Sequence, residues 1–193
     1  MSLDCEECLE TFQSGLEGLA LQAEVDTRFP SFRCEKCKVS PYSPGPVADG
    51  ENLIFLAIHP IHFDEKTNTL APLAFEQLTR NDLSLLRHEY CCDDLPQTVE
   101  QLRSGGAADR SIELCVVLQA SEIRQIKDAN GRVLGVYDTA LSDRMSHASL
   151  FVRKDYLADK AARQRARMIV HRTFKDRIRQ LQEVSVTIPP CRG

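Results

Sequence analysis

Two pairs of cysteines near the N-terminus constrain this chain more than any other feature. Cys5-Glu-Glu-Cys8 and Cys34-Glu-Lys-Cys37 are two C-x-x-C motifs with 25 residues between them. Four thiolates at this spacing can bind one zinc ion as a closed tetrahedron, in which no coordination position remains for a substrate. The sequence therefore predicts a structural Zn²⁺ with Cys5, Cys8, Cys34 and Cys37 as its ligands.

This metal prediction defines an N-terminal module, residues 1–40, which resembles a zinc ribbon or zinc knuckle. An iron–sulfur cluster uses the same ligands, and four unrelated reduced thiols are a further alternative, but the linker length favours zinc. The N-terminus lacks the basic and apolar segments of a signal peptide. We therefore expect a cytoplasmic protein, in which paired cysteines favour a metal over a disulfide.

The remaining residues, 47–193, are expected to form an α+β domain after a boundary rich in proline and glycine at 41–46. Buried or alternating apolar runs predict strands at 52–58, 83–86, 112–119 and 148–152, and a hairpin that turns at Asn130-Gly131. Short helices are expected near 73–78 and after Pro96, and helical spacing of apolar residues predicts one long C-terminal helix over about 155–183. We therefore predict a mixed, mainly antiparallel sheet with short helices and a long C-terminal helix, preceded by the zinc-ribbon-like module.

Charge is distributed unevenly along the chain. The formal net charge is −4, but residues 153–180 contain ten Lys or Arg against three Asp, so the rest of the chain carries −11. On the predicted helix, Arg163, Arg167 and Lys175 fall on one stripe, and Arg179 follows it. Such a stripe can bind nucleic acid or an acidic protein surface, or it can pair with the acidic part of its own chain. No apolar run approaches the roughly 20 residues needed to span a bilayer.

Histidines form the other candidate site. His59, His62 and Asp64 lie close together where the strand over 52–58 ends, and His147 precedes a later strand. Two imidazoles and a carboxylate can bind a catalytic metal ion or serve as acid and base. This H-x-x-H pattern lacks the helical i, i+4 spacing of metalloproteases. Histidines that satisfy loop carbonyls are the simpler alternative.

These features support two functional hypotheses. The first is a zinc-stabilised interaction or regulatory protein that engages a partner protein or nucleic acid through the basic helix. The second is a metal-assisted hydrolase or nuclease that uses His59, His62 and Asp64 with assistance from His147, which requires these side chains to converge in one cleft. No glycine-rich phosphate loop is present, which argues against nucleotide hydrolysis.

Overall fold

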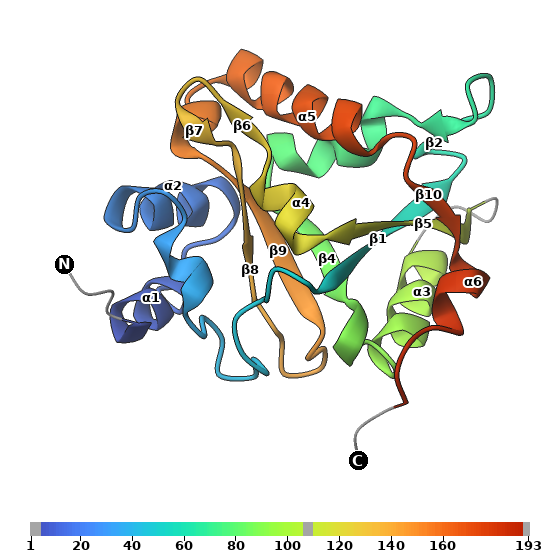
Figure 1. Ribbon diagram of the computed structural model, residues 1–193, viewed down its shortest axis with the longest axis horizontal. Coiled ribbons are helices and arrows are strands. Elements are labelled where there is room, and N and C mark those ends of the chain that lie inside the picture. Colours follow the sequence, from blue (N-terminus) through green and yellow to red (C-terminus); the bar gives the residue numbers. More distant parts are fainter. Residues whose placement is uncertain (1–4, 106–109, 191–193) are drawn as a thin grey trace.

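A six-stranded sheet organises the protein (Figure 1). The computed structural model describes residues 5–105 and 110–190. The strand order is β10-β5-β1-β4-β9-β8, and every neighbouring pair is antiparallel. The strands are β1 (Asn52–His59), β4 (Leu83–Arg87), β5 (Ser111–Gln119), β8 (Leu134–Tyr137), β9 (His147–Val152) and β10 (Ile178–Gln180). The predicted α+β class and mainly antiparallel sheet are confirmed.

Helices cover both faces of this sheet, because the side chains of its central strands are apolar on both sides. In β1, Leu53 and Phe55 belong to one buried cluster, whereas Ile54 and Leu56 belong to another. The first cluster is closed by α5 (Lys160–Phe174), α4 (Ala120–Arg124) and the 3-10 segment η2 (Pro72–Thr79). The second is closed by α3 (Asp94–Ser104) and α6 (Leu181–Ser185), on the opposite side in Figure 1.

The single long helix predicted over 155–183 is not formed. A short 3-10 turn, η4 (Lys154–Leu157), comes first, and α5 begins only after Asp159, whose carboxylate accepts the Ala162 N–H at 2.7 Å. After Phe174 the chain leaves the helix, and β10 pairs with the outer edge of β5, with Ile178 opposite Val116. Pairing of an otherwise open sheet edge therefore overrides the local helical spacing of apolar residues.

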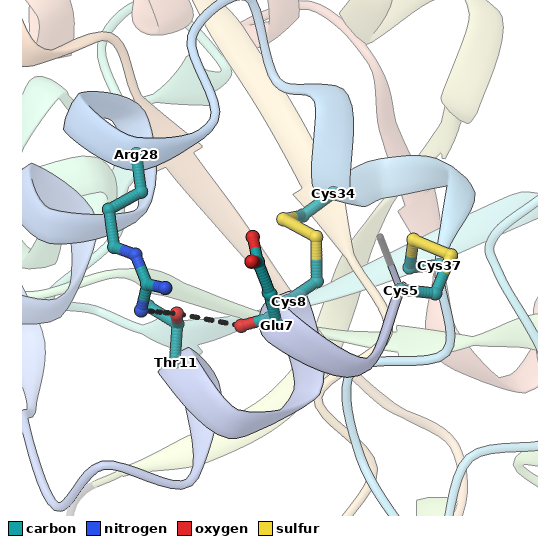
Figure 2. Close-up of a disulfide and its surroundings, with 7 residues drawn as sticks. All are labelled: Cys5, Glu7, Cys8, Thr11, Arg28, Cys34 and Cys37. Carbon is teal, nitrogen blue, oxygen red and sulfur yellow. Dashed lines mark hydrogen bonds between the residues drawn. A yellow bond between two sulfur atoms is a disulfide. The ribbon is translucent and has the colours of Figure 1, made fainter. Parts of the chain in front are cut away.

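Disulfides, not a metal ion, hold the N-terminal segment together. This segment contains α1 (Cys5–Phe12), α2 (Gly18–Arg28) and the 3-10 turn η1 (Arg33–Lys36). Cys5 is bonded to Cys37 and Cys8 to Cys34, as Figure 2 shows. The prediction of a zinc-ribbon-like module with structural Zn²⁺ was wrong, because the four sulfurs are bonded to one another and provide no thiolate ligand. In the described part of the chain, no group of three or more His, Cys, Asp or Glu residues could hold a metal ion.

The same disulfides correct the expected location. Disulfides form and persist in oxidising compartments, whereas cytoplasmic thiols are kept reduced. The two bonds therefore point to an oxidising environment, and the prediction of a cytoplasmic protein was wrong.

Hydrogen bonds also connect α1 and α2. Arg28 of α2 donates to the Thr11 hydroxyl at 2.6 Å, and Thr11 donates to the Glu7 carbonyl at 2.8 Å (Figure 2).

Aromatic packing joins this N-terminal segment to the β8 edge of the sheet. The ring of Phe12 lies 5.2 Å from that of Tyr137 and 5.7 Å from that of Phe151, measured between ring centroids. Phe32, next to η1, lies directly against Gly135 of β8.

The domain boundary proposed at 41–46 stays a prediction. None of the helices within residues 5–105 and 110–190 is long and apolar enough to cross a membrane.

Candidate functional site

The sheet opens between β1 and β4. These strands pair at only two positions, Leu53 with Arg87 and Ile54 with Leu86, whereas β1 pairs with β5 along most of its length. Beyond Ile54 the two strands no longer pair, and a cavity of about 280 Å³ lies between them, with η2 and α3 forming part of its walls. Its walls are mainly apolar, and its polar side chains are His62, Glu76, Gln77, Ser84, Thr98, Arg144 and His147. We call this space the inter-strand cavity.

A β-bulge in the pairing of β1 with β5, near the end of β1, positions His62. The register between β1 and β5 shifts between Ala57 and His59, which leaves Ile58 outside the regular ladder. The Ile58 N–H donates to Nδ1 of His62 at 3.2 Å, and the Ile58 carbonyl accepts the His62 N–H at 2.7 Å. His62 thus satisfies both backbone groups of Ile58, and these two hydrogen bonds hold its ring in place.

This contact also fixes the tautomer of His62. Burial, followed by the nearby positive charge of Arg110, lowers the pKa of His62 to about 4, so the ring is neutral at pH 7. Because Nδ1 accepts a hydrogen bond, the proton of the neutral ring is on Nε2. His62 therefore offers the inter-strand cavity a hydrogen-bond donor.

His147 has the opposite arrangement. It begins β9, and its Nδ1 lies 3.0 Å from both the carbonyl oxygen and the hydroxyl of Thr139. A carbonyl oxygen only accepts, so Nδ1 carries the proton, and the Thr139 hydroxyl is free to bond Ser149 Oγ at 2.7 Å. Burial lowers the pKa of His147. The neutral ring therefore keeps a lone pair on Nε2, which makes His147 a hydrogen-bond acceptor and a base.

Two neutral imidazoles of opposite tautomer thus line one cavity. A donor such as His62 can polarise a carbonyl group, and a base such as His147 can take a proton from water or a hydroxyl.

The two charged residues of the cavity, Glu76 and Arg144, differ in whether a residue of opposite charge pairs with them. Glu76 pairs with Arg167 of α5, whereas Arg144 donates to the uncharged side-chain oxygen of Gln101 at 2.7 Å and forms no salt bridge with the residues that the structure describes.

His59 and Asp64, the other two predicted catalytic residues, lie elsewhere. His59 Nε2 is 3.4 Å from Glu65 and lines a different hollow, together with Phe63. Asp64 lies in the small hairpin of β2 (Phe63–Asp64) and β3 (Thr69–Leu70), where it accepts the Lys66 N–H at 3.0 Å. The structure thus brings together His62 and His147 but not the full predicted set.

The predicted basic stripe lies against its own chain for much of its length. Arg167 pairs with Glu76 of η2, and Arg163 donates to the Leu157 carbonyl at 3.1 Å. Lys175 is half-buried, and its carbonyl accepts the Leu70 N–H at 3.1 Å. Arg179 is exposed on β10 and lines the hollow that contains His59.

The remaining cysteines offer no reactive thiol at this site. Cys91 and Cys115 are free and buried, and burial raises the pKa of each to about 12. Cys92 is disulfide-bonded. A buried thiol whose pKa is raised stays protonated and is inert as a nucleophile.

Sequence reasoning did not identify Arg144 or Glu76 as cavity residues. Glu76 lies in a segment expected only as a short helix, and Arg144 lies in the loop before β9. No local motif marks either position, since both reach the cavity through tertiary packing.

No protein-family model, curated protein or solved structure matches this chain.

Proposed function

We propose that the protein is a hydrolase of ester or amide bonds that uses His147 as general base and His62 as electrophile. The supporting observation is the pair of neutral imidazoles with opposite tautomers at one cavity. Mainly apolar walls suit a substrate whose acyl part is apolar.

The reaction follows from the two ring nitrogens. The substrate carbonyl accepts a hydrogen bond from Nε2–H of His62. Water attacks the carbonyl carbon while Nε2 of His147 takes its proton, and the oxyanion that forms is stabilised by His62. Collapse of the tetrahedral intermediate breaks the bond to the leaving group, which receives the proton from His147.

Binding of an acidic protein or nucleic acid through α5 has less support, because Arg163 and Arg167 are engaged within the chain. This alternative stays a prediction that rests on the exposed cations of the helix, Lys160, Arg165 and Arg172.

The test is hydrolysis of 4-nitrophenyl butyrate by the purified protein and three variants. We expect His147→Ala to lower kcat/KM by about 10²–10⁴-fold and His62→Gln by about 10²–10³-fold. His59→Ala serves as the matched control, since this histidine lies outside the cavity, and it should leave the rate unchanged. Circular dichroism would establish that all three variants are folded.

The pH dependence separates a base from a merely structural histidine. Because burial lowers the pKa of His147, its base form should persist below pH 6.5, and kcat/KM should fall only at more acidic pH. His147→Ala should remove this acidic limb. Absence of hydrolysis by the parent protein, or equal rates for the parent and His147→Ala, would refute the proposal.

A further inference from the structure

An open hollow of about 670 Å³ lies between the N-terminal segment and the sheet. It is bounded by α1, the start of α2, residues 39–42, residues 81–82 and the loop at 139–143. We call it the N-terminal groove. It is more than twice the volume of the inter-strand cavity, and it is more open to solvent.

Apolar side chains are exposed in this groove. In the described part of the chain, six large hydrophobic side chains are exposed, and three of them line the groove. Leu16 is 40% exposed, Tyr42 51% and Leu141 42%. Behind them lie the less exposed rings of Phe12 and Phe151. An exposed apolar surface gathered in a concave site, rather than scattered singly, is typical of a binding site.

The charges of the groove all have one sign. Glu17, Asp82 and Asp143 line it, and none of its described lining residues is lysine or arginine. Across residues 5–105 and 110–190, no salt bridge is formed by any of these three carboxylates. An occupant with positive charge would therefore meet carboxylates that have no competing cation in the groove.

We propose that the N-terminal groove binds an extended polypeptide segment in which apolar side chains are interspersed with lysine or arginine. The apolar side chains would pack on Leu16, Tyr42 and Leu141, and the basic side chains would approach Asp82 and Asp143. Because the groove lining contains both kinds of surface, one short segment with both kinds of side chain can contact both. Polar side chains along the walls, Gln13, Asn81 and Ser142, can bond its backbone groups.

The position of His147 connects this site to the inter-strand cavity, because His147 lines both. If the proposed hydrolysis is correct, the bound polypeptide belongs to the substrate. Binding itself does not require catalysis, so the two proposals can fail separately.

The test measures binding by fluorescence anisotropy, without turnover, using the fluorescein-labelled octapeptide LKAFKGLK. Two counterparts separate charge from apolar contact: LEAFEGLE replaces each lysine by glutamate, and SKASKGSK replaces leucine and phenylalanine by serine. We expect saturable binding of LKAFKGLK and at least tenfold weaker binding of either counterpart. Raising the salt concentration from 50 to about 500 mM should weaken the binding of LKAFKGLK.

Variants locate the site. Asp82→Asn combined with Asp143→Asn should weaken binding of LKAFKGLK at least tenfold, and Leu16→Ser combined with Tyr42→Ser should do the same. The matched control is Asp93→Asn combined with Glu100→Gln, which removes two exposed carboxylates outside the groove and should change affinity less than twofold.

Four outcomes would overturn the proposal. They are no binding of LKAFKGLK, equal binding of all three peptides, an equal loss in the control variant, and full displacement by spermine at the peptide's own concentration. The last result would show a site for small polycations rather than for polypeptide. Peptide binding that persists in His147→Ala without any hydrolysis by the parent protein would support the groove and refute the hydrolase.

Discussion

The contact between Phe32 and Gly135 fixes the N-terminal segment on the sheet, and Gly135→Ala should disrupt it. A Cβ atom at position 135 would lie 2.3 Å from Cδ1 and 2.8 Å from Cγ of the Phe32 ring. Phe32 is 3% exposed, has a positive φ of 60° and lies under the Arg132 guanidinium at 4.9 Å. The ring is therefore enclosed on several sides and has little space in which to retreat.

The expected loss of stability follows from the 2.3 Å separation between the added Cβ and the Phe32 ring. To restore an ordinary contact of about 3.4 Å, the ring or strand β8 must move by about 1 Å, and overpacking of this kind costs about 1–3 kcal/mol. We expect Gly135→Ala to lower the free energy of unfolding by about 2–3 kcal/mol. Phe32→Ala should itself cost about 3–5 kcal/mol through the cavity that it leaves.

A double-mutant cycle in urea, followed by circular dichroism, tests this reasoning. In the Phe32→Ala background the obstruction is gone, and alanine is favoured over glycine in a strand by about 0.5–1 kcal/mol. Gly135→Ala should then be neutral or stabilising, which gives a coupling free energy of at least about 2 kcal/mol. An equal loss in both backgrounds, or a loss below about 0.5 kcal/mol in the parent, would refute the close contact.

Further variants test other parts of the structure. Glu51→Gln should lower the free energy of unfolding by about 1.5–3 kcal/mol in urea, because Glu51 accepts two hydrogen bonds from the buried Arg87, which keeps Asp138 at 3.2 Å as its other anionic partner. Arg87→Met should cost about 3–5 kcal/mol, because it also leaves the buried Asp138 without its cation, and equal losses in the two variants would contradict this reasoning. Cys5→Ala with Cys37→Ala should cost only about 2 kcal/mol, because the inner disulfide already closes most of the loop and about six residues remain. Thiol titration of the unfolded parent without reductant is the control, and reactive thiols from this pair would contradict the disulfides.

Much of the sheet could be predicted because its strands carry their own patterns. The apolar runs over 52–58 and 112–119 became β1 and β5, and Asn130-Gly131 lies at the turn between β6 (Lys127–Asp128) and β7 (Gly131–Arg132). The C-terminal helix could not be predicted in full, since the apolar spacing near Ile178 suits a helix as well as an edge strand. The choice depends on β5, more than 50 residues earlier, which local pattern does not contain.

The cysteines show a different limit of sequence reasoning. C-x-x-C spacing predicted that Cys5, Cys8, Cys34 and Cys37 would come together, and the structure places all four side by side. The spacing does not encode whether the sulfurs bind a metal or one another, because both need the same proximity. That choice depends on the redox state of the surroundings, and the prediction of zinc rested on an assumed reducing cytoplasm.

Only part of the candidate site could be predicted from the sequence, and the reason is structural. His62 and His147 were recognisable as residue types at strand ends, but what makes them a pair is their tautomers, and these are set by backbone groups. At His62 the responsible group is the Ile58 amide, which a bulge removes from the ladder, and at His147 it is the Thr139 carbonyl. The shift in pairing sets two residues of β5, Ile112 and Glu113, opposite the single residue Ile58 of β1, so the Ile58 amide is left free to orient His62. The orientation of this donor therefore depends on how β1 pairs with β5, which is tertiary information that the local pattern around Ile58 does not contain.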